Sequence, residues 1–157
     1  ERFGAPLNAG GIEIRQVRRE EAGDWSGLLS RIFFGDQAAD FQELFTPWAA
    51  TDNPLCLAAL VEGRMIAGAG GMLVPEHRMA AFFGAATLAQ YRGRGLQMAF
   101  MHQRLRVAQQ AGCDLAVTLT MPGTTSQRNV ERAGFRVAYT KVVVGKAPPA
   151  SATAKEH

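Results

Sequence analysis

Apolar and polar residues recur with two different periods along the first half of the chain. Residues 12–18 alternate, which predicts a strand with one buried face. Apolar residues then recur at helical spacing in residues 20–34 and 38–50, so we predict two helices, the second kinked or ended by Pro47. Three short apolar runs separated by turn residues follow, and each is a predicted strand: residues 55–61, 65–74 and 79–88.

The second half of the chain continues with a long helix, a strand, a short helix and a last strand: residues 96–111, 113–120, 124–133 and 136–144. The expected order is β-α-α-β-β-β-α-β-α-β, an α/β domain with a mixed, mostly antiparallel sheet flanked by helices. It covers residues 12–145. Residues 1–11 look like an irregular lead-in, and residues 146–157 lack core-forming residues, so we expect a disordered tail.

Composition limits the class of protein. A chain of 157 residues with 47% hydrophobic content forms one domain with a real core. No apolar run is long enough to span a bilayer and no signal peptide is visible, so we expect a cytoplasmic protein without a membrane partner. Cys56 and Cys113 lie in apolar segments and are expected to be reduced, buried thiols. The spacing of cysteines and histidines predicts no metal site.

Charge is distributed unevenly. Residues 20–52 contain seven acids and one base, Arg31, a net charge of −6, whereas the whole chain has +3. The remainder is therefore basic, which suits an anionic ligand. Nucleic acid is the competing partner, but no basic helix face with interleaved aromatic residues is present, so we predict no nucleic-acid binding.

The most informative stretch lies where residues 79–88 lead into the helix that begins near Leu96. Gly93 and Gly95 let the backbone pass close to a ligand, and the start of the helix offers free N–H groups and the positive end of its dipole. Arg92 and Arg94 add positive charge. This combination predicts a phosphate site. It is not a nucleotide-triphosphate P-loop, because no Gly-Lys-Ser/Thr follows, nor a dinucleotide fingerprint, because the third glycine is missing.

Gln90-x-x-Gly93-x-Gly95 resembles the pyrophosphate loop of the GNAT (N-acetyltransferase) superfamily, and Ser126-x-x-Asn129-x-x-x-x-Gly134-Phe135 resembles the short helix that ends in Gly-Phe in that family. The element order is also similar. The resemblance implies acetyl-coenzyme A as acyl donor, lying in a gap between the fourth and fifth strands, with Gly84 marking a bulge. It implies these cofactor-binding residues: Ala85, Thr87, Arg92, Gly93, Arg94, Gly95, Leu96, Gln97, Ser126 and Asn129.

The catalytic residues of the family are not matched. Aligning the Gly-Phe pair places Val130 where the family has its usual tyrosine acid and Gly123 where it has an asparagine. Ser126 or Asn129 is then the replacement for the asparagine. Tyr139 is the remaining candidate acid and His77 the candidate base, while a buried structural tyrosine and a solvated histidine are the alternative interpretations.

Two functions stay open at this point. One is an acetyl-coenzyme A-dependent N-acetyltransferase that acts on a small-molecule or protein amine. The other is a GNAT-fold module that binds coenzyme A or has a structural or regulatory role in a longer chain, in line with a sequence that starts at Glu1. A homodimer is compatible with either. In the family, residues 20–52 would cover the acceptor side, and their negative charge predicts a cationic amine, although the acids could instead only cap helices and solvate a surface.

Overall fold

The computed structural model describes residues 7–9, 11–41, 43–52, 54–142 and 144–145. In these residues six strands form one sheet in the order in which they occur along the chain. The strands are β1 (Leu7–Ala9), β2 (Ile12–Gln16), β3 (Leu57–Val61), β4 (Arg64–Val74), β5 (Met79–Thr87) and β6 (Leu115–Thr118). Neighbouring strands are antiparallel except β5 and β6, which are parallel because a helix connects them across the sheet.

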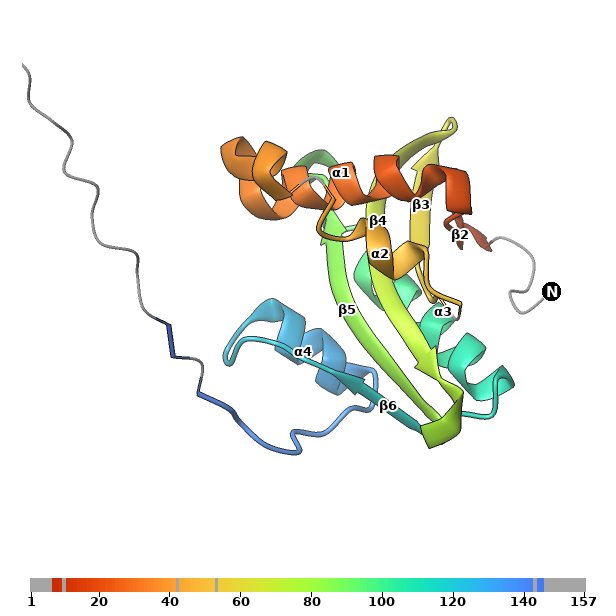
Figure 1. The fold of residues 1–157 in the computed structure, drawn as a ribbon, viewed down its shortest axis with the longest axis vertical. Coiled ribbons are helices and arrows are strands. Elements are labelled where there is room, and N and C mark those ends of the chain that lie inside the picture. Colours follow the sequence, from red (N-terminus) through yellow and green to blue (C-terminus); the bar gives the residue numbers. More distant parts are fainter. Residues whose placement is uncertain (1–6, 10, 42, 53, 143, 146–157) are drawn as a thin grey trace, which may run out of the picture.

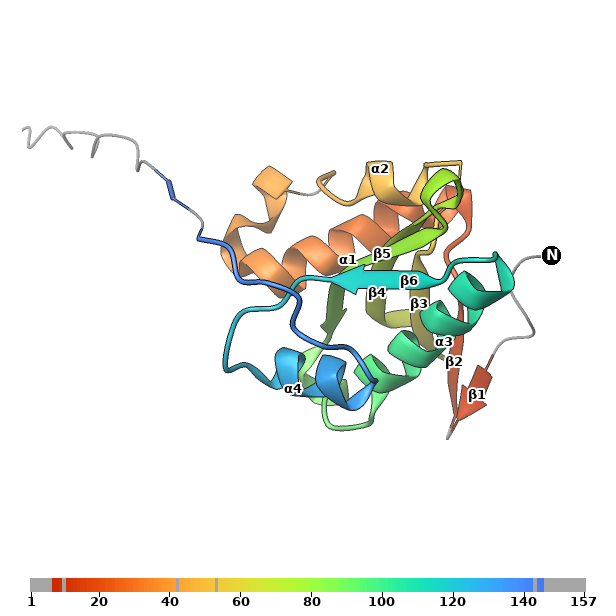
Figure 2. The same cartoon turned by 90° about the horizontal axis from the view of Figure 1, so that it is seen from below.

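Helices cover both faces of this sheet (Figures 1 and 2). α1 (Ala22–Phe34) and the short α2 (Thr46–Ala49) lie on one face, and α3 (Leu96–Gln110) and α4 (Thr125–Arg132) on the other. Short 3-10 segments connect the elements: η1 (Arg19–Glu21), η2 (Gly35–Phe41), η3 (Pro75–His77) and η4 (Ala89–Tyr91). The mixed sheet flanked by helices confirms the predicted fold class.

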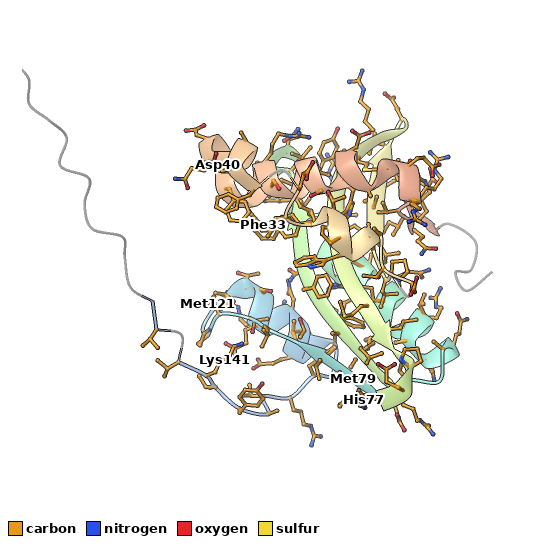
Figure 3. All side chains as sticks on the ribbon, viewed as in Figure 1. Phe33, Asp40, His77, Met79, Met121 and Lys141 are labelled. Atoms are coloured by element: carbon orange, nitrogen blue, oxygen red, sulfur yellow. The ribbon has the colours of Figure 1, made fainter. Side chains whose placement is uncertain are left out.

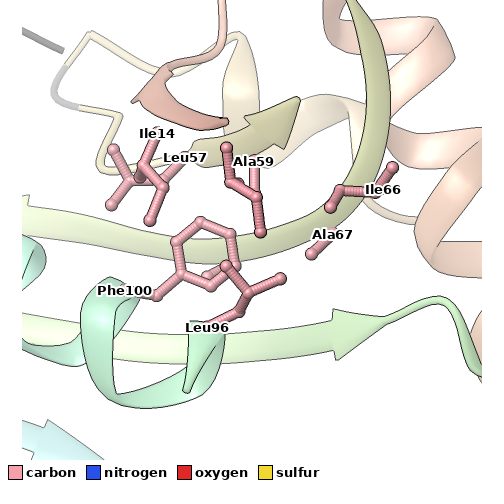
Figure 4. Packing of buried hydrophobic residues seen from close by; sticks show 9 residues of the cluster. Ile14, Leu57, Ala59, Ile66, Ala67, Leu96 and Phe100 are labelled. Carbon is pink, nitrogen blue, oxygen red and sulfur yellow. The ribbon is translucent and has the colours of Figure 1, made fainter. Parts of the chain in front are cut away.

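Buried apolar side chains fix α3 against the sheet, as Figure 4 shows. Leu96 and Phe100, one helical turn apart, pack on Ile14, Leu57 and other residues of the central strands. On the opposite face Trp25 of α1 is fully buried and its Nε1 donates a hydrogen bond of 3.0 Å to the carbonyl of Leu57. Packing against the sheet therefore fixes the position of the first turn of α3 and of the loop that precedes it.

The N-terminal segment differs from the prediction. Residues 7–9 were expected in an irregular lead-in, yet they form β1 and pair with β2. Their alternation is too short to be recognised in the sequence, and the hydrogen-bonded edge of β2 supplies the pairing. The rest of the lead-in (1–6 and 10) and the predicted tail (146–157) lie outside the described residues.

The predicted second helix, 38–50, is also corrected. Its place is taken by the 3-10 segment η2 and the four-residue α2, with Pro47 in the first turn of α2. Proline is favourable in the first turn of a helix but disrupts a helix interior. The aromatic residues at helical spacing are therefore divided between η2 and α2 and do not form one long helix.

The predicted last strand, 136–144, is not formed. The described residues from Arg136 to Gly145 have no regular secondary structure and are exposed. Alternation of apolar residues gives strand propensity, but a strand also needs a hydrogen-bonded neighbour. β6 is four residues long and is the last strand of the sheet among the described residues.

Candidate functional site

The loop between η4 and α3 has the backbone of an open anion site. Gly93 and Gly95 have φ of +76° and +75°, conformations that glycine adopts without strain. A Cβ atom built on either glycine would meet no atom within 4 Å. Packing therefore does not explain the two glycines, and the loop surface is accessible to a ligand.

The glycines of β4 have the opposite environment. A Cβ on Gly68 would lie 2.5 Å from Nε1 of Trp25, and one on Gly70 would lie 2.7 Å from the ring of Phe83. Both belong to β4, within the strand predicted for residues 65–74. Steric packing accounts for these glycines, whereas backbone conformation accounts for those of the loop.

Positive charge gathers at the loop. Gly95 has no side chain to cap α3 and the first turn of the helix has no acid, so its first N–H groups and the positive dipole end are available. Arg92 and Arg94 are exposed. The Nε of Arg92 donates to the carbonyl of Thr87 at 3.2 Å, and the guanidinium of Arg94 lies 5.2 Å from the centroid of the Tyr91 ring. These contacts hold both charges beside the loop.

The second sequence motif lies next to the first. Nε2 of Gln97 donates to Oγ of Ser126 at 3.1 Å, and Nδ2 of Asn129 donates to Oε1 of Gln97 at 2.7 Å. α4 begins after Thr124, whose side chain accepts a hydrogen bond from the N–H of Gln127 at 3.2 Å. The structure thus connects three of the predicted cofactor-binding residues, one on α3 and two on α4.

β5 carries a bulge at the position predicted from Gly84. Gly68 pairs with Ala86 and Gly70 with Phe83, so two residues of β5 lie opposite one residue of β4. Gly84 has φ of +56°, and a Cβ there would lie 3.2 Å from the ring of Trp48. A bulge interrupts the ladder and leaves backbone groups unpaired. Here it does so at the middle of the candidate site.

β5 and β6 diverge just before this bulge. Their parallel pairing ends at Phe82 and Thr118, and no later residue of β5 pairs with β6 in the described chain. A cavity of about 270 Å³ lies at the divergence and extends to Gln97 at the start of α3. It is lined by Phe33, Phe83, Gly84, Ala85, Gln97, Met101, Arg104, Thr118, Leu119, Thr120, Met121, Thr124, Ser126 and Val130.

Arg104 lines the cavity and is not among the predicted site residues. It lies on the buried side of α3, 1% exposed, one turn after Phe100, and its guanidinium lies 4.7 Å from the centroid of the Phe82 ring. Burial lowers the pKa of Arg104 to about 10, which leaves the side chain charged at neutral pH. The available signal was an arginine four residues after a buried phenylalanine within an apolar stripe.

A row of aromatic side chains leads to the cavity from the α1 side of the sheet. Phe45 and Trp48 have ring centroids 4.9 Å apart, and Trp48 and Phe83 have centroids 4.0 Å apart. Phe33, at the end of α1, is 5.8 Å from Phe45 and lines the cavity together with Phe83. Figure 3 shows Phe33 and Met121 on opposite sides of this region.

Neither of the two candidate catalytic residues lines the cavity. Tyr139 is 74% exposed in the segment that follows α4, so it is not a buried structural tyrosine. His77 is exposed on η3, next to the start of β5 (Figure 3), whereas the cavity borders residues 83–85 of that strand. Six residues of a strand span roughly 20 Å. Val130 does line the cavity, as expected for the position of the family's tyrosine.

Other expected features are distributed over the rest of the fold. Cys56 is buried, and burial raises the pKa of its thiol to about 11. Cys113 is half-buried, with its thiol pKa raised by burial and by Asp114. In the described part of the chain, no cluster of three or more acids, histidines or cysteines is placed to hold a metal ion. None of the helices there is both long and apolar enough to cross a membrane.

Comparison with known proteins identifies a family that shares this architecture. Residues 16–135 match the family model of the acetyltransferase (GNAT) family. No curated protein matches the chain.

Solved structures share the fold at low sequence identity. Aminoglycoside N-acetyltransferase AAC(6')-Iy, in complex with the bisubstrate analogue CoA-S-monomethyl-acetylneamine, is 20% identical with a TM-score of 0.67, covering 87% of this chain and 99% of that one. A transcriptional regulator from Bacillus halodurans C-125 is 15% identical, with a TM-score of 0.69 and coverages of 86% and 99%. Ribosomal-protein-alanine N-acetyltransferase from Brucella melitensis biovar Abortus 2308 is 14% identical, with a TM-score of 0.67 and the same coverages.

The family model covers most of the chain, and it includes the loop, the bulge and the Gly-Phe helix that carried the resemblance. Members of this family use acetyl-coenzyme A. The chain belongs to the GNAT acetyltransferase family.

Proposed function

We propose that this domain is an acetyl-coenzyme A-dependent N-acetyltransferase that transfers the acetyl group to an amine by direct attack. The observation that carries the proposal is the cavity where β5 and β6 diverge, which reaches Gln97 at the end of the Gly93–Gln97 loop. The loop offers an anion site and the bulge of β5 offers unpaired strand backbone. Together they fit a ligand with a pyrophosphate and an amide-containing arm.

The predicted cofactor-binding residues supply groups for each part of acetyl-coenzyme A. The N–H groups of Gly93 to Gln97, with Arg92 and Arg94, would hold the pyrophosphate. Backbone groups of Ala85 and Thr87 would pair with the pantetheine, although the carbonyl of Thr87 already accepts a hydrogen bond from Arg92. The cofactor supplies an activated acetyl thioester. A backbone N–H left unpaired by the bulge at Gly84 would stabilise the oxyanion.

The acceptor would approach from the α1 side, between Phe33 and Phe83, and reach the cavity opposite the cofactor loop. The cavity lining contains no carboxylate and no histidine among the described residues. In this proposal the neutral amine attacks the thioester carbonyl and the C–S bond breaks. Solvent takes the amine proton and protonates the leaving thiolate of coenzyme A, so activity should rise with pH above neutrality. This route does not use the acid and base predicted from the sequence, Tyr139 and His77, because a role for either would require movement of its segment toward the cavity.

The second candidate function is a module that binds coenzyme A without catalysis. One observation favours it: Val130 lines the cavity at the position expected for the family's tyrosine acid and has no proton to donate. Release of free thiol from acetyl-coenzyme A in the presence of a panel of amines discriminates between the two functions. Binding without any thiol release would support the module.

The cofactor site is tested by calorimetry on a matched pair of variants. Gly95→Asp places a carboxylate beside the expected pyrophosphate and should weaken acetyl-coenzyme A binding by more than about tenfold, about 1.4 kcal/mol. Gly95→Asn has nearly the same shape, tolerates positive φ and carries no charge. We expect it to bind clearly more tightly than Gly95→Asp. Equal affinities of the two variants and the wild-type protein would overturn the loop assignment.

A further inference from the structure

Arg104 is a buried cation that the protein does not neutralise. Its side chain is 1% exposed, and no acid of the described chain forms a salt bridge with it. Buried charges are normally paired, because the loss of hydration is costly. A leucine or methionine at this position of α3 would fill the core without that cost. The retained charge points to a ligand that supplies the missing anion.

Three backbone carbonyls orient the guanidinium. Nε donates to the carbonyl of Phe100 at 3.3 Å, and Nη1 donates to Gly70 at 2.7 Å and lies 3.5 Å from the carbonyl of Phe83. Nη2 makes no hydrogen bond to a described residue. No fully enclosed side-chain nitrogen or oxygen of the described residues lacks a partner, and Arg104 lines the cavity, so we assign Nη2 to the cavity wall.

The position of Arg104 excludes the pyrophosphate as its anion. Arg104 is nine residues after Gly95 on α3, roughly 13 Å along the axis at 1.5 Å per residue. It lies instead beside Gly70 and Phe83, the last pair before the bulge at Gly84. The proposed function places the thioester at that bulge. In that arrangement Nη2 of Arg104 would lie beside the acyl group.

We propose that Arg104 determines acyl specificity, so that an acyl group ending in a carboxylate is bound in preference to a neutral acyl group of the same length. This inference rests on the proposed function and names the class of acyl donor: coenzyme A thioesters of dicarboxylic acids, with succinyl-coenzyme A as the probe. A carboxylate at Nη2 would form a charge-assisted hydrogen bond and neutralise the buried charge. The cavity of about 270 Å³ is several times the roughly 30 Å³ of one water molecule, so a few additional atoms can be accommodated.

The test compares ligands of equal chain length on the full chain. Succinyl-coenzyme A and butyryl-coenzyme A both carry four-carbon acyl groups and differ in the terminal carboxylate. Calorimetry should give at least about tenfold tighter binding of the succinyl compound, the effect of one charged hydrogen bond. Because the pair is buried, this preference should change little with salt, unlike the overall affinity.

Two variants test whether the preference for the succinyl compound depends on Arg104. Arg104→Met keeps the length and apolar contacts of the side chain, so butyryl-coenzyme A binding should persist while the succinyl preference disappears. Arg106→Met removes an exposed arginine of the same helix and should keep the preference. If Arg104→Met does not fold, the comparison of the two ligands on the wild-type protein still shows whether the carboxylate preference exists.

The outcomes separate this inference from the proposed function. If coenzyme A and acetyl-coenzyme A bind but the succinyl and butyryl compounds have equal affinity, the specificity of Arg104 is overturned and the proposed function stands. If no coenzyme A compound binds, both are overturned. A succinyl preference that survives Arg104→Met would also refute the assignment to this residue.

Discussion

At the scale of single residues, glycines of one sequence pattern serve different purposes. Gly93 and Gly95 have positive φ and open surroundings, whereas Gly68 and Gly70 are closely surrounded in β4. The sequence indicated the difference only through context, since one pair precedes a helix with arginines and the other lies in an apolar run. Steric packing around a glycine cannot be inferred from the sequence, because it depends on side chains far away along the chain.

The packing of Gly68 gives a stability prediction. Gly68→Ala places a methyl group 2.5 Å from Nε1 of Trp25, whose hydrogen bond to Leu57 leaves it little room to move. We expect a loss of roughly 1–3 kcal/mol in the free energy of unfolding, as for other overpacked cores. Denaturant unfolding monitored by circular dichroism measures this value.

Gly23→Ala is the matched control, because a Cβ at Gly23, within α1, meets no atom within 4 Å. Alanine is the better helix former, so this change should stabilise by about 0.5–1 kcal/mol. Similar unfolding midpoints for both variants would show that β4 and α1 are not packed as described.

An ion-pair cluster at the N-terminal end of α1 predicts a pH dependence of stability. The side chain of Glu21 is 14% exposed and accepts hydrogen bonds of 2.7 Å from Arg15 and 2.6 Å from Arg18. These two partners hold the pKa of Glu21 well below its usual range. The stabilisation is therefore fully present above the ordinary glutamate pKa of about 4.3 and is lost as the pH falls through the lower folded-state pKa.

The Glu21 contribution can be measured as a difference between variants. Glu21→Gln removes the charge but keeps the shape, and it should cost roughly 1.5–3 kcal/mol at neutral pH. Below about pH 4 the stability gap between Glu21→Gln and the wild-type protein should narrow steadily. A gap that is the same at pH 3 and pH 7 would show that the charge of Glu21 contributes nothing.

At the scale of secondary-structure elements, regular segments with a strong period could be predicted and segments that depend on a distant partner could not. The bounds of α1, α3 and the strands β2 to β6 lie within two residues of the predicted ones. The predictions for residues 7–9 and for residues 136–144 were wrong for one shared reason. A strand exists only where another strand offers hydrogen bonds, and that is information about tertiary structure. Likewise, the charge of Arg104 could not be placed at the cavity until α3 was docked on the sheet.

The C-terminal edge of the sheet predicts self-association. Leu115, Val117 and Leu119 of β6 and its extension are exposed, as are Val137 and Tyr139 in the segment after α4. An unpaired edge with apolar side chains is a template for pairing with another chain. We expect a dimer at protein concentrations of about 100 μM, in the range where exposed edges associate. Sedimentation equilibrium measures the association constant.

Val117→Lys places a charge on this edge and should shift the protein toward the monomer. Thr125→Lys, at an exposed position of α4, has the same change of charge away from the edge and should leave the association constant unchanged. A wild-type protein that stays monomeric over the whole concentration range would refute pairing through β6.

At the scale of the whole molecule, the two sides of the candidate site differ in charge. Arg92, Arg94 and the start of α3 are on the cofactor side. The acids of residues 20–52 lie on α1 and the segments next to it, but they are not equivalent, since Glu21 is neutralised by Arg15 and Arg18. Asp36, Asp40 and Glu43 have no salt-bridge partner in the described chain. Asp40 lies on η2, which follows the end of α1 that carries Phe33 (Figure 3), and Phe33 lines the cavity.

This asymmetry predicts a cationic acceptor. A negative approach to the cavity raises the local concentration of positively charged amines and repels anionic ones. We therefore expect polyamine-like, aminoglycoside-like or lysine-type amines to be acetylated with higher kcat/KM than neutral or acidic amino compounds. Because the approach also holds the amine protonated, the rate should increase with pH above neutrality. Thiol release with a panel of amines measures both trends.

Charge variants test which carboxylates attract the cationic acceptor. Asp36→Asn with Asp40→Asn should raise KM for a polyamine severalfold at low salt and leave kcat nearly unchanged, because these carboxylates attract the acceptor without contacting the reacting atoms. Asp24→Asn is the control, since Asp24 belongs to the same acidic region but borders a separate groove between α1 and the β3–β4 hairpin. If the control raises KM as much as the double variant, the effect comes from total charge. If acidic amino acids are acetylated as fast as polyamines, the negative side has no part in choosing the substrate.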